Sequence, residues 1–509
     1  MRIERTKNTI NGTIFGIVLK VITIVFPFAI RTIFIKLIGA EYLGLNSLFS
    51  SVLQVLNLAE LGVGGALVFS MYKPIIEDDD KKICALMKLY RTYYRIIGLV
   101  ILVLGLMISP FLNLFIKGEI PSDINIYIIY YMQLLATVLS YWLFAYRNCL
   151  FQAFQRTDIV SIITIIINLC LYAVQIICLL IWKNYYLYLG ISIVFQILSN
   201  VVTAVVSKRT FPRYNPEGYV DKDEVKEINN KVKSLFTAKI GSVVAQSFDA
   251  LVISAFMGLT ALAIYQNYFY IFSSVYAMIM VIFSSSQAGI GNYLLTHDEK
   301  NNRELFYIFN YVTAFIAAIG CCCFLNLYQP FMELWVGKDY MLTDAHVVLL
   351  VIYFFVYLVL RPFCVFKDSA GMWQQDKFRP LASALFNLTL NIVTVRYIGL
   401  YGVIGSTICA VVFVSMPWVI ININRNMFHL NVLELLAKEL GYAIITVLCC
   451  ILTWFVSSLI STENVFVLLL IRLLVSIVIP IILFGSVYYK SDENAYIMSH
   501  WRGLLKGRM

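Results

Sequence analysis

Long apolar runs separated by short polar loops occupy the sequence from residue 10 almost to its end. Most of these runs reach the length of about 20 residues that a helix needs to cross a bilayer. They predict about fourteen membrane-spanning helices, at 10–38, 43–72, 83–115, 123–152, 158–182, 186–207, 234–257, 261–294, 304–327, 342–366, 376–395, 399–424, 435–460 and 463–489. Several runs exceed the bilayer thickness, so we expect those helices to tilt or to project from the membrane.

The composition supports the same class of protein. Of the 509 residues, 61% are hydrophobic and 13% are charged, which excludes an ordinary soluble domain. The net charge of +10 would suit nucleic acid, but the basic residues lie in short loops between apolar runs and therefore favour membrane orientation instead. We expect an all-α polytopic membrane protein with no nucleic-acid partner.

The basic residues also predict which side of the membrane each loop faces. Most of the 39 lysines and arginines fall in alternate loops, starting with the N-terminus. Cytoplasmic loops carry the excess of positive charge in membrane proteins. The pattern therefore places both termini in the cytoplasm.

One long polar stretch, residues 208–233, divides the predicted helices into six before it and eight after it. A short echo supports duplication, because Phe49-Ser50-Ser51-Val52 recurs as Phe272-Ser273-Ser274-Val275. We expect an N-lobe (1–207), a cytoplasmic linker (208–233), a C-lobe (234–424), and two accessory helices with a cytoplasmic tail (425–509). Two pseudo-symmetric six-helix lobes around a central cavity are typical of transporters.

The first apolar run carries two cations, Lys20 and Arg31. They are eleven residues apart and so lie within roughly 20° of each other around a helix. A cation inside a bilayer is costly unless it faces water or an anion, so both are candidates to line the cavity. Two alternatives stay open: Arg31 can extend to the outer interface, and Lys20 can form a structural pair with Glu60 or Asp249.

Three further ionisable residues lie inside predicted spans. Lys239 and Asp249 belong to the seventh span, and Arg361 precedes Pro362 in the tenth. Lys239 and Arg361 join the candidate cavity cations. Asp249 and Glu60 are candidates either to couple transport to a proton or Na⁺, or to pair with a lysine.

Uncharged polar residues recur on the same spans and suit the lining of a route for sugars. Amides and hydroxyls also hold membrane helices together, so packing is an equal alternative. The candidates are Asn46, Asn57, Gln246, Gln287, Asn387 and Asn391.

The sequence contains no pattern that points to an enzyme. The four histidines are scattered, and the eleven cysteines lie mostly inside apolar runs without metal-ligand spacing. We therefore expect no catalytic residues, no metal and no cofactor. Arg91, Arg95 and Arg147 lie at inner helix ends beside tyrosines, where anionic lipids are the expected partners.

The segment IGAEYLGLNSLFSSVLQVLNLAELGVGGALVFSMYKPI, residues 38–75, resembles the second span of Wzx-type polysaccharide flippases, members of the multidrug/oligosaccharidyl-lipid/polysaccharide (MOP) exporter superfamily. RYIGLYGVIGSTIC, residues 396–409, also resembles this family. The resemblance implies a flippase that moves undecaprenyl-diphosphate-linked oligosaccharide from the inner to the outer leaflet of the bacterial plasma membrane. It implies that Lys20, Arg31, Lys239 and Arg361 receive the pyrophosphate, and that polysaccharide polymerases and assembly proteins are partners.

The chain departs from two relatives of that family. Lipid II flippases concentrate arginines on spans one, two and eight, whereas span two here carries Glu60 and span eight carries no lysine or arginine. Drug/cation antiporters resemble one another in a span-one carboxylate, where this chain has Lys20. An antiporter remains an alternative, as does a membrane polymerase or ligase of lipid-linked glycans, although the outer loops are short for such an enzyme.

Overall fold

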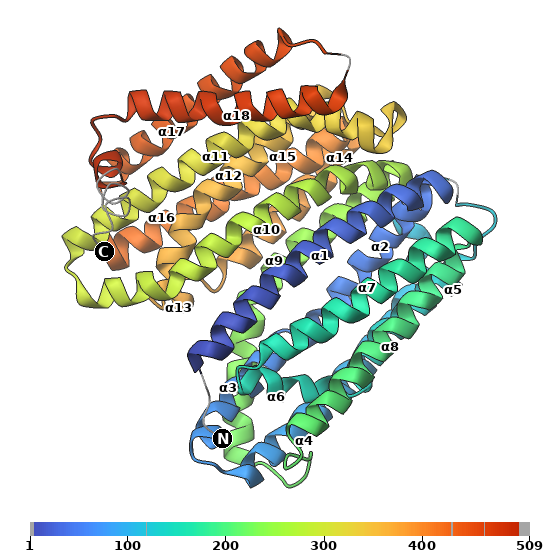
Figure 1. The fold of residues 1–509 in the computed structure, drawn as a ribbon. Helices are drawn as coiled ribbons and strands as arrows, with labels where there is room; N and C mark the ends of the chain where they lie inside the picture. Colours follow the sequence, from blue (N-terminus) through green and yellow to red (C-terminus); the bar gives the residue numbers. More distant parts are fainter. Residues whose placement is uncertain (1–4, 119, 429–430, 463, 498–509) are drawn as a thin grey trace. The chain divides into compact units, whose positions relative to one another are not determined.

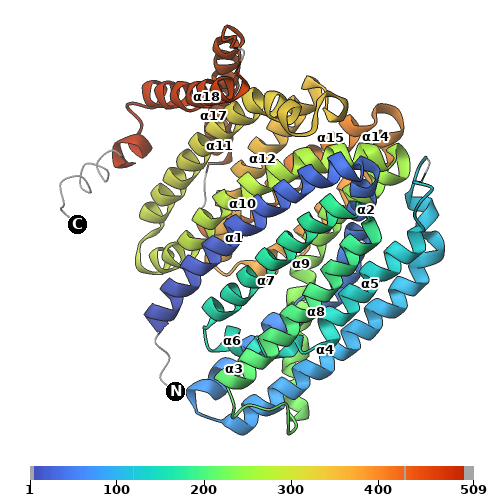
Figure 2. The ribbon, with the colours of Figure 1, turned by 45° about the vertical axis from the view of Figure 1, so that its right-hand side comes forward.

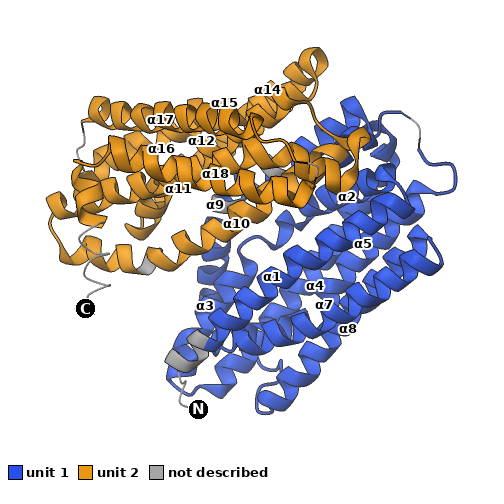
Figure 3. Cartoon of the chain, turned by 45° about the horizontal axis from the view of Figure 1, so that its top comes forward, with its two compact units in different colours: residues 1–263 blue, residues 264–509 orange. Residues whose placement is uncertain are grey.

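The structure is a computed structural model that describes residues 5–118, 120–428, 431–462 and 464–497, without the side chains of 5–10, 238, 239, 242, 245, 246 and 288. Helices make up its regular structure, and the described residues contain no strand. The chain forms two compact units, residues 1–263 and 264–509 (Figure 3). Each unit is described by itself below.

Unit 1 contains nine α-helices, three short 3₁₀ turns and the beginning of α10. They are α1 (Arg5–Leu37), α2 (Ala40–Leu56), η1 (Asn57–Glu60), α3 (Val63–Ile76), α4 (Asp80–Ile108), η2 (Ser109–Phe115), α5 (Ile126–Trp142), η3 (Ala145–Arg147), α6 (Asn148–Ala153), α7 (Thr157–Ile181), α8 (Tyr185–Thr210), α9 (Lys222–Met257) and α10 (Leu259–Thr296).

Long helix pairs build unit 1. α1 lies along α7 in the same direction, with Gly12 near Thr157 and Phe26 stacked on Tyr172, whereas α7 packs on α8 and α4 packs on α5 in opposite directions (Figures 1 and 2). α9 packs on α2 and α3. Gly44 lets α2 approach the start of α10 closely, because a Cβ at this position would lie 2.1 Å from the carbonyl oxygen of Leu259.

Unit 2 contains the rest of α10 and the elements that follow it. They are α11 (Glu299–Val336), η4 (Lys338–Tyr340), α12 (Asp344–Ser369), α13 (Trp373–Asp376), α14 (Arg379–Ile398), α15 (Leu400–Ala410), the π-helical turn η5 (Val411–Ser415), α16 (Met416–Ile423), the π-helical turn η6 (Asn424–Phe428), α17 (Val432–Ser458) and α18 (Val465–Val487).

α11 organises unit 2, since α12, α17 and α18 all pack against it (Figures 1 and 2). Small residues of α11 such as Ala318 and Cys322 meet Tyr442 of α17 and Phe484 of α18 in a buried apolar cluster. Beyond the end of α18, Glu493 accepts a hydrogen bond of 2.9 Å from Lys438 of α17. Burial works to raise the pKa of Glu493, but the Lys438 contact outweighs it and the pKa is lowered.

The predicted all-α, multi-span class is confirmed, and each of the fourteen predicted spans corresponds to helix. Among the described residues, twelve helices are long and apolar enough to cross a membrane. The pair Ile126–Trp142 and Ala145–Ala153, bent by 45°, makes a thirteenth. The predicted seventh span, residues 234–257, lies within α9; five of its side chains are outside the described residues, and Ser247–Met257 of the described part forms an apolar segment.

The boundary between the two units differs from the lobe boundary expected from the sequence. The units divide after residue 263, so that α9 belongs to unit 1, whereas the linker 208–233 was expected to separate the lobes. α9 joins unit 1 through its packing on α2 and α3. The division into an N-lobe, a linker, a C-lobe and accessory helices stays a prediction.

Candidate functional site

The predicted second span is broken between α2 and α3. The four residues Asn57–Glu60 form a 3₁₀ turn, and Gly62 follows with φ of 90°. Glycine is required here for two reasons. This φ is unfavourable for other residues. In addition, a Cβ at this position would lie 2.7 Å from Cβ of Leu235 and 2.8 Å from the carbonyl oxygen of Val232, both in α9. The break turns Glu60 towards α4 and α5.

Three tyrosines surround the Glu60 carboxylate, and we call this group the tyrosine cage (Tyr90, Tyr94 and Tyr141). Tyr94 donates to Oε1 of Glu60 at 2.6 Å, and Tyr141 donates to Oε2 at 2.8 Å. Tyr90 donates in turn to the hydroxyl of Tyr94 at 2.9 Å. All three tyrosines are buried, so both carboxylate oxygens are satisfied by neutral donors inside unit 1.

No lysine, arginine or histidine of the described chain lies within 4.0 Å of the Glu60 carboxylate, and the predicted alternative of a Lys20–Glu60 pair is not formed. Hydrogen bonds from hydroxyls stabilise a carboxylate but leave its negative charge in place. No cluster of three or more metal-binding side chains occurs among the described residues.

The polar residues predicted on the second span, Asn46 and Asn57, form hydrogen bonds with α5. Asn46 accepts a hydrogen bond of 3.0 Å from Nε2 of Gln133, and Asn57 accepts one of 3.3 Å from Tyr141. Asn57 and Glu60 thus share Tyr141. The candidate residues Asn57 and Glu60 are brought together in this way. Asn46 also joins α2 to α5, at an earlier position of α2.

The two cations of α1 have different surroundings. Lys20 is exposed, whereas Arg31 is half-buried near Tyr188 of α8, with which it interacts electrostatically. Asp249 of α9 is buried within unit 1. Lys239 and Gln246, the other candidates on α9, lie outside the described side chains.

Arg361 of α12 is the described candidate cation of unit 2. Its guanidinium carbon lies 5.2 Å from the ring centre of Tyr276 in α10 and 5.5 Å from that of Tyr357 in α12. These distances are within the range of cation–π attraction. Its Nε atom is buried without a hydrogen-bond partner, and no carboxylate of the described chain lies within 4.0 Å of it.

The remaining polar candidates of unit 2 lie mostly where helices pack on one another. Asn387 and Asn391 of α14 are buried against α15, and Asn387 accepts a hydrogen bond of 3.4 Å from Thr407. Gln287 is half-buried, and its backbone carbonyl accepts from the hydroxyl of Ser369 at 3.0 Å.

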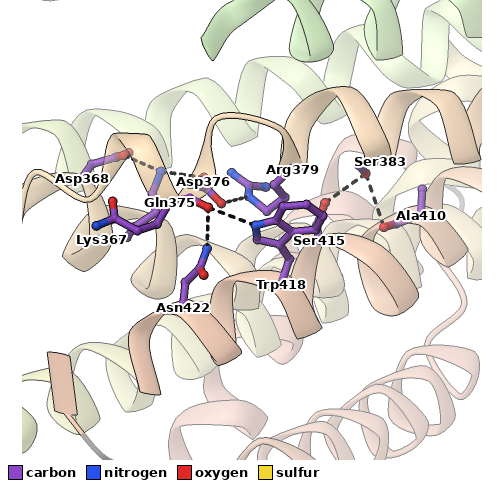
Figure 4. A network of polar contacts seen from close by, with 10 residues as sticks. All are labelled: Lys367, Asp368, Gln375, Asp376, Arg379, Ser383, Ala410, Ser415, Trp418 and Asn422. Carbon is purple, nitrogen blue, oxygen red and sulfur yellow. Dashed lines mark hydrogen bonds and ion pairs between the residues drawn. The ribbon is translucent and has the colours of Figure 1, made fainter. Parts of the chain in front are cut away.

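A second charged group lies where α12 leads through α13 into α14, and we call it the ion network (Lys367, Asp368, Asp376 and Arg379; Figure 4). Lys367 contacts Asp368 and Asp376, both at 2.7 Å, and Arg379 contacts Asp376 at 2.8 Å. Trp418 and Asn422 of α16 donate to the backbone carbonyl of Gln375 beside it (Figure 4). The two cations and two carboxylates compensate each other, which marks this network as structural.

Sequence reasoning missed the aromatic partners of both candidate groups. Tyr90 and Tyr94 are four residues apart and so share a helix face, which was the available signal for part of the tyrosine cage. Nothing in the linear pattern connects them with Tyr141. The pairing of Arg361 with Tyr276 likewise joins residues 85 positions apart and depends on the packing of α10 against α12.

Comparison with known proteins identifies the fold. The structure resembles a lipid II flippase, MurJ, in an inward closed conformation, with a TM-score of 0.63 and 15% identity over 94% of this chain and 99% of that chain. It also resembles a multidrug resistance MATE family transporter of the MOP superfamily in an inward-facing conformation (TM-score 0.60, 15% identity, 78% and 92% covered). A mutant of the Vibrio cholerae MATE transporter VcmN gives 0.58 at 12% identity, with 84% and 100% covered.

These neighbours are transporters and a flippase, not enzymes, and the chain shares their multi-pass membrane fold. No curated protein sequence matches the chain significantly. The family model of polysaccharide biosynthesis proteins, however, matches residues 9–286, which is more than half of the chain. The chain therefore belongs to the polysaccharide biosynthesis protein family.

Proposed function

We propose that the protein is a flippase that moves undecaprenyl-diphosphate-linked oligosaccharide repeat units from the inner to the outer leaflet for cell-surface polysaccharide synthesis. The family match supplies the connection with polysaccharide synthesis. The structural neighbours include a flippase of another lipid-linked precursor, lipid II. A lipid-linked glycan as substrate agrees with both.

The surroundings of Arg361 are the observation that most directly supports the proposal. A charged side chain inside a membrane span is costly, and those that occur there serve an ion or substrate pathway or pair with one another. Arg361 has no carboxylate within 4.0 Å in the described chain and keeps an unpartnered Nε, while Tyr276 and Tyr357 hold its guanidinium in place. Arginine binds phosphate groups through several N–H donors at once. The negative charge of a pyrophosphate would therefore compensate the positive charge of Arg361.

The proposed cycle is alternating access around the candidate cations. Lys20, Arg31, Lys239 and Arg361 would attract the pyrophosphate in the inward-open state, and amides such as Asn46 and Gln287 would contact the sugars. The prenyl chain would stay in the lipid. Rocking of the lobes would then release the sugar head outside.

Glu60 is the preferred coupling residue. Its oxygens accept two hydroxyl donors, and no lysine, arginine or histidine of the described chain lies within 4.0 Å of them, so no internal cation competes with a coupling ion. Asp249 stays the second candidate, and Na⁺ is the alternative coupling ion. We place the protein in the bacterial cytoplasmic membrane with both termini in the cytoplasm, beside polysaccharide polymerase and assembly proteins and anionic lipids.

The test replaces Lys20, Lys239 and Arg361 singly by alanine in the native host. We expect less surface polysaccharide and a build-up of the lipid-linked repeat unit on the inner side. Arg472→Ala is the control, because Arg472 is also an arginine inside a span of unit 2 with a buried, unpartnered Nε, but its Nη1 donates to the backbone carbonyl of Asn326 at 3.4 Å. Normal surface polysaccharide in all three variants, without precursor build-up, would contradict the proposal and would favour a non-transporting scaffold.

A drug/cation antiporter is the second candidate function, favoured by the fold shared with MATE transporters and by a carboxylate in unit 1. Dye efflux by the purified protein in vesicles with an imposed proton or Na⁺ gradient distinguishes it. Efflux that survives Lys20→Ala and Arg361→Ala but is lost in Glu60→Gln would favour the antiporter. Formation of a polymeric glycan by the purified protein would favour a polymerase instead.

A further inference from the structure

The buried arginine Arg147 is not paired with a carboxylate in the part of the chain that the structure describes. It ends the 3₁₀ turn η3 between α5 and α6, and only 8% of the residue is exposed. Its Nη1 atom is enclosed without a hydrogen-bond partner, and no carboxylate of the described chain lies within 4.0 Å of the guanidinium. Removing a cation from water without a compensating charge costs several kcal/mol.

The backbone conformation between α5 and α6 determines the position of Arg147. Phe144 adopts a left-handed conformation with φ of 60°, and the helix bends by 45° between α5 and α6. The carbonyl oxygen of Arg147 accepts a hydrogen bond of 3.4 Å from Ser207 of α8. The side chain is therefore held at the level of the last turn of α8, which also carries Lys208 and Arg209.

A second guanidinium shares an aromatic ring with Arg147. The guanidinium carbons of Arg91 and Arg147 each lie 5.9 Å from the ring centre of Tyr146. Arg91 is half-buried on α4, and Arg95 lies one turn further along the same helix. None of the three arginines has a carboxylate within 4.0 Å among the described residues. Two cations beside one ring repel each other unless an anion lies between them.

We propose that Arg147, Arg91 and Tyr146 form a binding site for a phosphate group, separate from the candidate transport cations. Nη1 of Arg147 is enclosed without a hydrogen-bond partner, and 8% of the residue stays exposed, so a ligand can reach the side chain from the surface. Arginine pairs recognise phosphate through parallel N–H donors, and the Tyr146 ring fixes their orientation. The phosphate can belong to an anionic lipid headgroup or be free inorganic phosphate.

The position at the end of α8 favours the lipid headgroup. Lysines and arginines beside the inner ends of membrane helices bind anionic lipids, and Lys208 and Arg209 add positive charge at this level. The proposed site does not bind the transported glycan, so this proposal can be tested independently of the proposed function.

The test compares the purified full-length protein in detergent with phosphatidylglycerol, with zwitterionic phosphatidylcholine, or with sodium phosphate. We expect phosphatidylglycerol to raise the midpoint of thermal unfolding and phosphatidylcholine to have no such effect. In Arg147→Gln, phosphatidylglycerol should bind roughly tenfold to a hundredfold more weakly, since a hydrogen bond to a charged group is lost. A rise with sodium phosphate alone, lost in the same variant, would assign free phosphate as the ligand.

Arg209→Gln is the control, because Arg209 is exposed on the neighbouring helix end and contributes only unspecific positive charge, so this variant should lose clearly less lipid affinity than Arg147→Gln. Without lipid, Arg147→Gln should unfold at the same temperature as the wild type or higher, because an uncompensated charge has been removed. If Arg147→Gln does not fold, Arg91→Gln is measured in the same way, with the same expected loss. Wild-type lipid affinity in the folded variant, or an equal loss in Arg209→Gln, would overturn the proposal.

Discussion

The buried and half-buried cations of the described residues differ in how their charge is compensated. Lys367 and Arg379 meet carboxylates at 2.7 Å and 2.8 Å in the ion network. Arg361 and Arg147 meet aromatic rings and have no carboxylate within 4.0 Å among the described residues. The first kind is explained by the fold alone, whereas the second kind calls for an anion from outside the chain.

Asp376 is the central member of the ion network, and its loss should be more damaging than that of Lys367. Asp376 contacts both cations, so Asp376→Asn leaves Lys367 and Arg379 with only the half-buried Asp368. We expect Asp376→Asn to destabilise the protein by about 3–5 kcal/mol, as for a broken buried pair. Lys367→Met, which leaves the Asp376–Arg379 pair intact, should cost less. Thermal unfolding of the purified variants measures the difference.

The double variant Lys367→Met/Asp376→Asn is the control for this prediction. If the two groups act as a pair, the double variant loses less stability than the two single changes added together. Equal stability losses in both single variants would show that the two cations do not depend on Asp376 as the geometry indicates.

At the scale of the helices, the apolar pattern was sufficient to locate the spans but not the breaks inside them. The glycines at 62, 64 and 65 were a visible signal for the break between α2 and α3. The bend between α5 and α6 had no such signal, because Phe144, which is neither glycine nor asparagine, occupies its left-handed position. Tertiary packing decides that conformation.

The same limit applies to the candidate site. Ionisable residues inside apolar runs could be recognised one by one, since any charge in a span is unusual. Their partners could not, because Glu60 meets Tyr141 across 81 residues of sequence. Likewise, the polarity of Asn387 and Asn391 was visible in the sequence, but their burial against α15 depends on a helix pair that the pattern does not specify.

The close approach of α2 to the start of α10 should tolerate no side chain at Gly44. A Cβ there would lie 2.1 Å from a backbone oxygen, which cannot rotate away, so one of the two segments must move. We expect Gly44→Ala to destabilise the protein by about 3 kcal/mol, at the upper end of overpacking effects. Gly190→Ala in α8 is the matched control, because nothing lies within 4 Å of its Cβ position.

The control variant should be as stable as the wild type or more so, since alanine favours a helix by about 1 kcal/mol over glycine. Thermal unfolding in detergent measures both variants. A Gly44→Ala protein with the melting temperature of Gly190→Ala would mean that α2 and the start of α10 are not in contact in the folded protein.

At the scale of the whole molecule, the two units contribute different candidate groups. Unit 1 holds the two cations of α1 and the Glu60 carboxylate, and unit 2 holds Arg361. The all-α, multi-span class followed from hydropathy, with twelve candidate spans among the described residues, or thirteen with the bent pair, where about fourteen were expected. The sidedness of the molecule rests on the distribution of lysine and arginine and is open to direct measurement.

Single cysteines at exposed loop positions test that sidedness. Tyr219, which is 90% exposed, lies in the polar stretch expected in the cytoplasm, and Lys338 lies in a loop expected outside. A membrane-impermeant maleimide should label Lys338→Cys in intact cells, and Tyr219→Cys only after permeabilisation. The unmodified chain measures background reaction of its own cysteines. Labelling of Tyr219→Cys in intact cells would reverse the predicted orientation.

The aromatic support of Arg361 has a consequence for turnover. A guanidinium already paired with a carboxylate would have to exchange one anion for another, and the displaced carboxylate would compete for the cation at every step. A guanidinium resting on the faces of Tyr276 and Tyr357 has no internal competitor, because the rings attract it without neutralising it. Arrival of a phosphate then needs no displacement of an internal anion, and its departure leaves the guanidinium on the same two rings, as a carrier that must let its cargo go requires.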